Sequence, residues 1–388
     1  MLTLMLMASI SALAMNIYLP SLPQMALDFS TTPAAMGLSV GVYLGASAVI
    51  QLFAGPISDR IGRRKIVQFS LIVFVIASVS CAYAQSFETF LLYRALQAVA
   101  ATCMIVSRAI VRDTTDTAGS GSRIAYVTMG MAVVPMFSPA LGGLIETHYG
   151  WQGTFFVLAS LGSIMLALSY FDQGETAPAS EHSILGQFQN YPLLLTSKRF
   201  WGYCLASAFG SGSFFAYLGG APAVGVDVYA LDPQTVGLFL GAPAFGYFFG
   251  NLIAGRYSKS IGIDLMVLYG LSLALCGMTL SFIMSGLGYG SAFSFFGFMT
   301  FVGLGNGMSI PNATAGMLAI KPELAGTASG LGSAMMIGGG AALSALAGPV
   351  LQIGTGDFAL IALMWVSIFI GILFILLVIR RNRTLHLE

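Results

Sequence analysis

Apolar residues recur along the whole chain in blocks of about 20 residues, and short polar segments separate the blocks. A helix of about 20 residues spans the ~30 Å hydrocarbon core of a bilayer. Helices are favoured over strands because backbone polar groups in lipid must be satisfied within their own segment. The pattern therefore predicts an all-α membrane protein with twelve transmembrane helices, at about 2–22, 35–56, 66–84, 88–111, 124–146, 153–171, 199–220, 234–257, 264–284, 288–312, 323–348 and 357–379.

The predicted helices divide into two sets of six. The longest hydrophilic stretch lies between them, so we expect an N-terminal six-helix bundle over 1–171, a cytoplasmic linker over 172–198 and a C-terminal six-helix bundle over 199–388. The halves also match at an offset of 200 residues, where Gly41, Gly55, Ser58, Ile61, Gly62 and Val67 correspond to Gly241, Gly255, Ser258, Ile261, Gly262 and Val267. Parallel repeats of this kind are typical of transporters whose substrate path runs between the halves.

Composition excludes a soluble protein and a nucleic-acid-binding protein. Of the 388 residues, 57% are hydrophobic and only 8% are charged, which is too few charged residues for a soluble surface of this size. The formal net charge of +1 provides no basic face for nucleic acid. The first apolar block has no basic segment before it and continues into the repeating pattern, so we interpret it as a membrane span rather than a signal peptide.

The sequence also lacks the residue patterns of enzyme and metal chemistry. Its three histidines are isolated and its four cysteines form no CxxC pair, so we expect no metal and no cofactor. It contains no Gly-rich phosphate loop. The acidic residues, Asp59 and Glu146 among them, all fall at predicted helix ends or in loops, where no pair is placed for general acid–base work. We therefore expect a transporter that is not an enzyme.

The basic residues are distributed asymmetrically. Fourteen of the sixteen lysines and arginines lie in the even-numbered loops or at the C-terminal end, and the other two, Arg94 and Arg108, lie within the fourth predicted helix. The odd-numbered loops contain none. Because cytoplasmic loops carry an excess of basic residues, we expect a multi-pass protein with both termini in the cytoplasm.

A motif follows the second predicted helix, where residues 55–65 read Gly-Pro-Ile-Ser-Asp-Arg-Ile-Gly-Arg-Arg-Lys. Glycines permit a tight turn and close helix approach, and an acid at a membrane edge can face the N-terminus of a neighbouring helix or an arginine. The spacing resembles the loop signature of the major facilitator superfamily. The resemblance implies two six-helix bundles and a cytoplasmic conformational switch that includes Gly55, Asp59, Arg60, Gly62, Arg63 and Arg64, with Asp59 near the start of the eleventh helix.

Two further helices carry residues that are unusual in lipid. Counting ~1.5 Å per residue, Arg94 lies about 9 Å below the outer end of the fourth helix, where an arginine normally faces a polar cavity. With Gln97 it resembles the superfamily motif whose arginine takes part in proton or substrate coupling. Prolines and glycines in the fifth helix are explained by a packing kink, but they also resemble an antiporter motif. The predicted switch thus extends to Arg108, Arg112, Asp113, Pro139, Gly142 and Gly143.

The chain as a whole resembles the Bcr/CflA type of drug-resistance transporter. The resemblance rests on Met-Asn-Ile-Tyr-Leu-Pro-Ser-Leu-Pro at 15–23, on 107–113, on Gly-Trp-Gln at 150–152 and on Pro-Asn-Ala at 311–313. It implies a drug:proton antiporter of the bacterial inner membrane that exports small amphipathic compounds such as antibiotics. The alternative is that the same fold imports or exchanges a cellular metabolite, since fold does not determine the substrate. The expected partners are a small-molecule substrate, protons and the lipid bilayer, and we expect a monomer.

The substrate site is expected between the first, fourth, seventh and tenth helices, because aromatic, Met and amide side chains there offer an adaptable surface. Its candidate residues are Asn16, Tyr18, Arg94, Gln97, Phe209, Phe215, Tyr217, Asn306 and Asn312. Transporters of the Bcr/CflA type usually have Asp at the position of Asn16 and tend to have Arg at that of Gln152. A side-chain amide cannot take up and release a proton as a carboxyl group does. Arg94, which we predict at the same depth as Asn16, is therefore left without an acidic partner. Either a substrate carboxylate or water and backbone carbonyls would then satisfy it.

Overall fold

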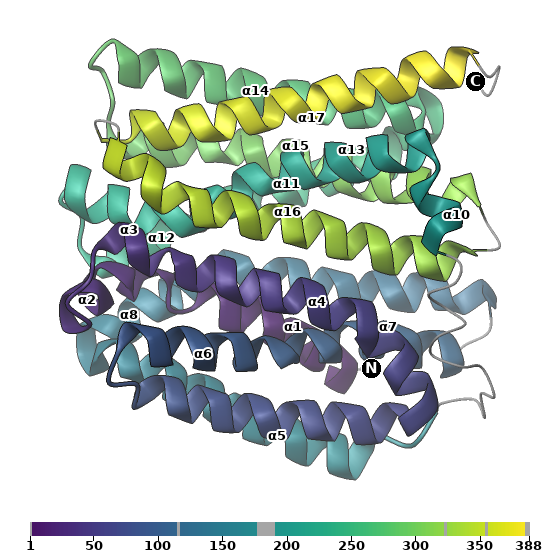
Figure 1. Ribbon diagram of the computed structural model, residues 1–388, viewed down its shortest axis with the longest axis horizontal. Helices are drawn as coiled ribbons and strands as arrows, with labels where there is room; N and C mark the ends of the chain where they lie inside the picture. The colour runs from purple at the N-terminus through teal and green to yellow at the C-terminus, as the bar shows by residue number, and fades with distance from the viewer. Residues whose placement is uncertain (1, 115–116, 177–190, 322–323, 354–355, 385–388) are drawn as a thin grey trace.

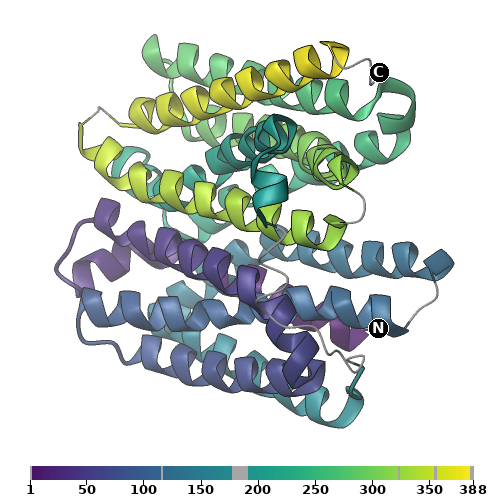
Figure 2. The same cartoon turned by 45° about the vertical axis from the view of Figure 1, so that its right-hand side comes forward.

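The fold is given by a computed structural model in which residues 2–114, 117–176, 191–321, 324–353 and 356–384 are described. The described residues form helices without strands. Figures 1 and 2 both show the N-terminal half, coloured purple through blue to blue-green, as one layer of helices and the C-terminal half, coloured from teal through green to yellow, as a second layer stacked on it. Both chain termini lie toward one end of the molecule, called here the terminal end; the opposite end is the distal end.

The N-terminal half contains two interrupted helices. Its elements are α1 (Leu2–Asn16), η1 (Leu19–Ser21), α2 (Leu22–Asp28), α3 (Pro33–Met36), α4 (Leu38–Ile61), α5 (Arg63–Ala82), α6 (Phe87–Gln97), η2 (Ala98–Ala100), α7 (Ala101–Thr114) and α8 (Thr117–Asp172). The first predicted span is thus broken by the 3₁₀ turn η1, at the prolines that follow Tyr18, and extends to Asp28. The fourth is broken by η2, immediately after Gln97.

The C-terminal half consists of α10 (Tyr191–Leu195), α11 (Lys198–Ala223), η3 (Val224–Val228), α12 (Pro233–Leu240), α13 (Ala242–Ile261), α14 (Ile263–Gly286), α15 (Ala292–Ile320), α16 (Ala325–Ile353) and α17 (Phe358–Thr384). Side-chain caps explain where several of these helices begin. Ser291 forms a capping box with Ser294 at the start of α15, as Ser86 does with Thr89 at the start of α6, which satisfies backbone donors that a helix leaves unpaired.

The described helices confirm the predicted all-α membrane fold. Nine of them are long and apolar enough to cross a membrane. One of the nine, Phe137–Asp172, combines the fifth and sixth predicted helices, because α8 runs through both and bends at Gly150, whose φ is 70°. The α4 and α11 helices complete the predicted twelve, with α4 containing a shorter apolar run over Leu38–Ala54.

The 200-residue repeat extends to backbone geometry. Ser30 and Ala230 both adopt a φ of 51°, an uncommon value for a residue with a side chain. Gly62 and Gly262 end the second helix of their half at φ 108° and 88°, and each amide donates to the carbonyl of the matching serine four residues before. Equivalent turns at equivalent positions indicate that the two halves are repeats of one unit, with the equivalent of α4 divided into α12 and α13.

The two halves contact each other most closely toward the distal end. A Cβ built at Gly41 of α4 would lie 3.1 Å from the Ala341 carbonyl oxygen of α16, and the Gln352 amide donates to the Thr32 hydroxyl at 3.5 Å. On the other side of the interface α8 packs against α12, where a Cβ at Gly143 would lie 2.5 Å from the Pro233 carbonyl oxygen. The distal end is therefore closed in this structure.

Candidate functional site

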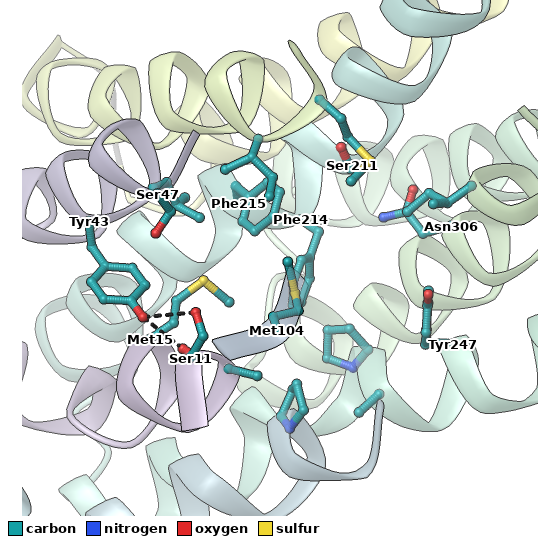
Figure 3. A pocket seen from close by; sticks show the side chains of 18 of the residues that line it. Ser11, Met15, Tyr43, Ser47, Met104, Ser211, Phe214, Phe215, Tyr247 and Asn306 are labelled. Carbon is teal, nitrogen blue, oxygen red and sulfur yellow. Dashed lines mark hydrogen bonds between the residues drawn. The ribbon is translucent and has the colours of Figure 1, made fainter. Parts of the chain in front are cut away.

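A cavity of about 280 Å³ lies between the two halves. Figure 3 shows Ser11, Met15, Tyr43 and Ser47 of the N-terminal half facing Ser211, Phe214, Phe215 and Asn306 of the C-terminal half across it. Eight helices contribute residues to its lining: α1, α4, α7, α8, α11, α13, α15 and α16. The second, fifth, eighth and eleventh spans therefore line the cavity as well as the four that the sequence predicted.

The cavity wall is mainly apolar and uncharged. None of the described residues that line it carries a charge; the polar ones are Ser11, Tyr43, Ser47, Gln51, Ser211, Tyr247 and Asn306. Several of these already have partners, since the Tyr43 hydroxyl donates to the Ser11 carbonyl at 3.0 Å and the Ser211 hydroxyl donates to the Ser207 carbonyl at 2.7 Å. The Ser47 hydroxyl is buried without a hydrogen-bond partner among the described residues, and a ligand with a polar group would satisfy it.

Arg94 lies behind this wall and does not line the cavity. Its side chain is fully buried, and its guanidinium lies between two aromatic rings, 4.2 Å from the ring centre of Tyr18 and 4.5 Å from that of Tyr43. It donates to the Ala14 carbonyl at 3.1 Å and to the Gln97 side chain. Arginine stacks on aromatic faces better than lysine does. The guanidinium therefore connects the cavity residue Tyr43 to the breaks in the first and fourth spans.

Asn16 and Gln97 have separate roles in this region. The Asn16 amide donates to the Ala12 carbonyl at 2.7 Å, within its own helix, and no hydrogen bond between Asn16 and Arg94 is found among the described residues. Gln97 accepts from Arg94 and donates to the Ser78 hydroxyl at 2.7 Å. Backbone and amide oxygens thus meet part of the hydrogen-bonding need of Arg94, but its Nε and Nη2 are buried without partners in the described structure.

The remaining predicted substrate residues divide between the cavity and the protein core. Phe215 and Asn306 line the cavity. Phe209 instead stacks on Phe374 of α17, with the two rings 9° from parallel. Tyr217 is fully buried and its hydroxyl donates to the Phe239 carbonyl. Asn312 donates to the Met308 carbonyl within α15. The structure therefore places two of the nine predicted residues on the cavity wall.

The predicted switch loop is anchored to the end of α8. The Arg63 amide donates to the Glu175 carboxylate at 2.8 Å, and its guanidinium donates to the Ser58 hydroxyl at 2.8 Å. Arg64 donates to the Tyr170 carbonyl at 2.7 Å, and Arg60 is exposed at the end of α4. The side-chain positions of Gly55, Asp59, Arg108, Arg112 and Asp113 lie outside the described residues, and with them the predicted contact of Asp59 with the eleventh helix.

The fifth-span motif lies at the distal end, between the two halves. A Cβ at Gly237 of α12 would overlap the Pro139 carbonyl of α8, and one at Gly143 of α8 would lie 2.8 Å from the Gln234 Cα of α12. Gly142 meets the Ile17 carbonyl on its other side. Such contact between backbones requires glycine, since any side chain would separate the helices. The three motif residues thus join α8 to α12 and to the first span.

Several site residues were missed from the sequence. Tyr43, Ser47 and Gln51 lie on one face of α4 and line the cavity. Their spacing of four residues places them on one face of an apolar helix. This spacing could have predicted a cavity-facing position, because polar residues in a span normally face the protein interior. Glu146 was assigned to a helix end, but α8 continues past it and only 9% of its surface is exposed. The fifth helix continues about one turn past its predicted end, to the bend at Gly150.

The described helices form two repeated halves, and the described residues that line the cavity between them carry no charge, an arrangement typical of a membrane transporter of the two-bundle type. The chain belongs to the major facilitator superfamily, since the family model described as Major Facilitator Superfamily matches residues 4–345. Solved structures of similar fold include a D-xylose-proton symporter, with a TM-score of 0.81 and 14% identity over 97% of this chain and 96% of that one. A bacterial homologue of the human lysosomal transporter Spinster, in an inward-facing and occupied conformation, has a TM-score of 0.71 and 16% identity over 98% and 96%.

Curated relatives include proteins named for drug resistance. The chloramphenicol resistance protein of Pseudomonas aeruginosa is 31% identical over 323 residues, or 82% of this chain and 76% of that protein. The uncharacterized MFS-type transporter YdgK of Bacillus subtilis is 31% identical over 66% of this chain and 65% of its own length. The multidrug resistance protein MdtL of Escherichia coli is 36% identical over 42% of each. The chain thus spans just under two thirds of the length of YdgK and less than half of that of MdtL.

Proposed function

We propose that this transporter exports small, neutral, amphipathic compounds from the bacterial cytoplasm in exchange for protons. The observation that carries the proposal is the uncharged lining of the central cavity. An ionic substrate would lose its hydration there without gaining a counter-charge, which is costly. A neutral ring system with hydroxyl or amide groups would instead contact Phe214, Phe215 and the methionines and hydrogen-bond to Ser47 or Asn306.

The size and the flexibility of the cavity suit compounds of this class. Its volume of about 280 Å³ is near the lower limit of the ~300–1,000 Å³ of small-molecule sites. Met15, Met104 and Met336 contribute unbranched side chains to the wall, and methionine adapts to differently shaped ligands. The names of the two drug-resistance relatives support an antibiotic as the substrate, and the resemblance to Bcr/CflA-type proteins supports antiport.

The orientation and the location also belong to the proposal. The distribution of basic residues supports a cytoplasmic position for the terminal end, and therefore a periplasmic position for the distal end. With the distal end closed, the cavity would be in the state that receives substrate from the cytoplasm. The same resemblance and the same charge pattern support an inner-membrane location and a cytoplasmic 172–198 segment, and we propose a monomeric unit.

One observation favours a second candidate, transport of an anionic metabolite. The Nε and Nη2 atoms of Arg94 are buried without partners among the described residues, and a carboxylate could accept from both. Such a substrate would first have to displace the Tyr43 ring, which covers the guanidinium at 4.5 Å. The two candidates predict opposite preferences when a neutral and an anionic compound compete for transport.

The test uses inverted membrane vesicles with an imposed pH gradient. We expect chloramphenicol to accumulate, and Phe215→Ala or Asn306→Ala to reduce its accumulation about tenfold, because each removes about 1–2 kcal/mol of contact or hydrogen bonding. Phe209→Ala is the matched control, since Phe209 lies on the same helix but stacks on Phe374 away from the cavity. A panel of antibiotics in a strain without its own pumps extends the measurement to other compounds.

The outcomes separate the two candidates. Competition by neutral analogues and not by small carboxylates supports neutral export. Preferential transport of carboxylates, abolished by Arg94→Ala, would replace it with the anionic alternative. Accumulation that does not respond to the pH gradient would contradict proton antiport.

A further inference from the structure

Glu146 is a buried carboxyl group beside the contact between the two halves. It lies on α8 one turn after Gly142 and Gly143, and 9% of its surface is exposed. Its Oε2 has no hydrogen-bond partner among the described residues. The fully buried Ser21 of η1 lies within hydrogen-bonding reach of this carboxyl group, and its hydroxyl has no other partner in the described structure. A buried carboxyl group and a buried hydroxyl thus lie together where the distal end closes, and one of the two carboxyl oxygens has no partner among the described residues.

A second carboxylate lies close to the first. Asp28 of α2 exerts an electrostatic influence on Glu146, and its own oxygens are satisfied, since Trp151 Nε1 donates to one at 2.7 Å and Gln24 Nε2 to the other at 3.1 Å. Neighbouring carboxylates of like charge do not both ionise readily. Because Asp28 has two donors and Glu146 Oε2 has none, the group that accepts a proton is Glu146.

Among the described residues, the other ionisable groups near this contact do not supply a counter-charge. On the opposite half, Asp232 precedes α12, and hydrogen bonds from the Thr235 hydroxyl and amide lower the pKa of its carboxyl, so it adds negative charge. On α8 itself His148 and Tyr149 are exposed. The described influences on Glu146 come from Ser21 and Asp28, and neither is a cation.

We propose that Glu146 binds a proton when the distal end closes. With the halves apart, water can solvate the ionised carboxylate. When α8 packs against α12 and the carboxyl group is buried, an unpaired charge is costly, whereas the protonated acid can donate from its O–H to the Ser21 hydroxyl. Closing is therefore coupled to proton uptake from the distal side.

This proton site is distinct from position 16, where transporters of the Bcr/CflA type usually have Asp. The Asn16 amide cannot titrate and is engaged with the Ala12 carbonyl. Glu146 lies on the other side of the same break in the first span, since Ser21 of η1 is its neighbour. A proton that is taken up from the distal side on closing returns to that side on opening, so the site controls closure and by itself carries no net proton flux. As a pH-sensitive closure of the distal end, the inference does not depend on which compound is transported.

The test measures closure directly, without substrate. Spin labels are attached at Tyr83→Cys and Ile353→Cys, two exposed positions at the distal end of opposite halves. Pulsed electron paramagnetic resonance in nanodiscs then measures the distance between the halves. The exposed Cys276 is replaced by Ser, and the other three cysteines are buried. We expect the closed-to-open ratio to rise as the pH falls, by up to ~10-fold per pH unit, the limit for one proton. Glu146→Gln should be closed at every pH, and Glu146→Asp should keep a pH response.

Glu88→Gln is the matched control, because Glu88 is exposed in the first turn of α6 and away from the contact between the halves. It should respond to pH as the unmodified chain does. A full pH response in Glu146→Gln, or none in the unmodified chain, would overturn the proposal. Loss of the response in Asp28→Asn with its retention in Glu146→Gln would do so too, by placing the proton on Asp28. Since no substrate is present, failure here is distinguishable from failure of the export proposal in vesicles.

Discussion

Gly143→Ala is expected to abolish most transport while leaving the protein folded. The new methyl group would lie 2.5 Å from the Pro233 carbonyl oxygen and 2.8 Å from the Gln234 Cα, and backbone atoms of a helix cannot turn aside as a flexible side chain can. Overpacking by one methyl group costs about 1–3 kcal/mol, which shifts an equilibrium ~5- to 150-fold. Because the contact exists only when the distal end is closed, the cost applies to that state.

The spin-label pair at positions 83 and 353 should therefore show Gly143→Ala with the distal end open, together with loss of vesicle transport. Gly45→Ala is the matched control. Gly45 also lies where the halves meet, but its Cβ would be 3.8 Å from the Ala341 side chain, an ordinary contact. If both variants transport like the unmodified chain, the close approach of α8 and α12 is not part of the cycle.

Arg94→Ala is expected to have the second large effect. The guanidinium makes two aromatic contacts in a fully buried site, each worth ~2 kcal/mol when desolvated, and its loss frees Tyr43 to move in the cavity wall. We expect transport to fall ~100-fold or more and the unfolding temperature to fall as well. Arg94→Lys keeps the charge but cannot stack on both rings while donating to Ala14, so it should restore stability more than transport.

Arg256→Ala is the comparison for Arg94→Ala, since Arg256 also lies over a tyrosine ring, 5.9 Å from the centre of Tyr257, but on an exposed surface. It should leave transport and unfolding temperature almost unchanged. Transport by Arg94→Lys at the unmodified rate would show that charge alone is needed, and would contradict a role for the stacked geometry.

These variants together separate three properties of the transporter. Phe215 and Asn306 report on what the cavity binds, Gly143 on whether the distal end can close, and Glu146 on whether a proton accompanies closure. Arg94 reports on the contact between the cavity residue Tyr43 and the interrupted first and fourth spans. If Phe215→Ala changes the substrate preference and Glu146→Gln changes only the pH response of closure, substrate binding and proton binding occur at separate sites.

The sequence by itself determined the membrane-spanning fold, because that fold depends on quantities that are local. Twenty apolar residues are long enough to cross a bilayer wherever they occur, and the family follows from motifs such as residues 55–65, whose spacing is fixed along the chain. Helix caps at Ser86 and Ser291 and the glycine turns at 62 and 262 are also local, so the repeat could be seen before the structure.

Only the tertiary structure decided which of the polar residues face the cavity. The sequence predicts Arg94 and Asn16 at the same depth in the membrane, yet Arg94 contacts Tyr18, Tyr43 and the Ala14 carbonyl, and Asn16 donates to its own helix. The 3₁₀ turns η1 and η2 interrupt the α-helical periodicity of both spans, so a helix face counted from one end of the span does not continue past the break. Likewise Glu146 is at a span end by hydropathy, but it is buried because α8 continues past it and packs against residues distant in sequence.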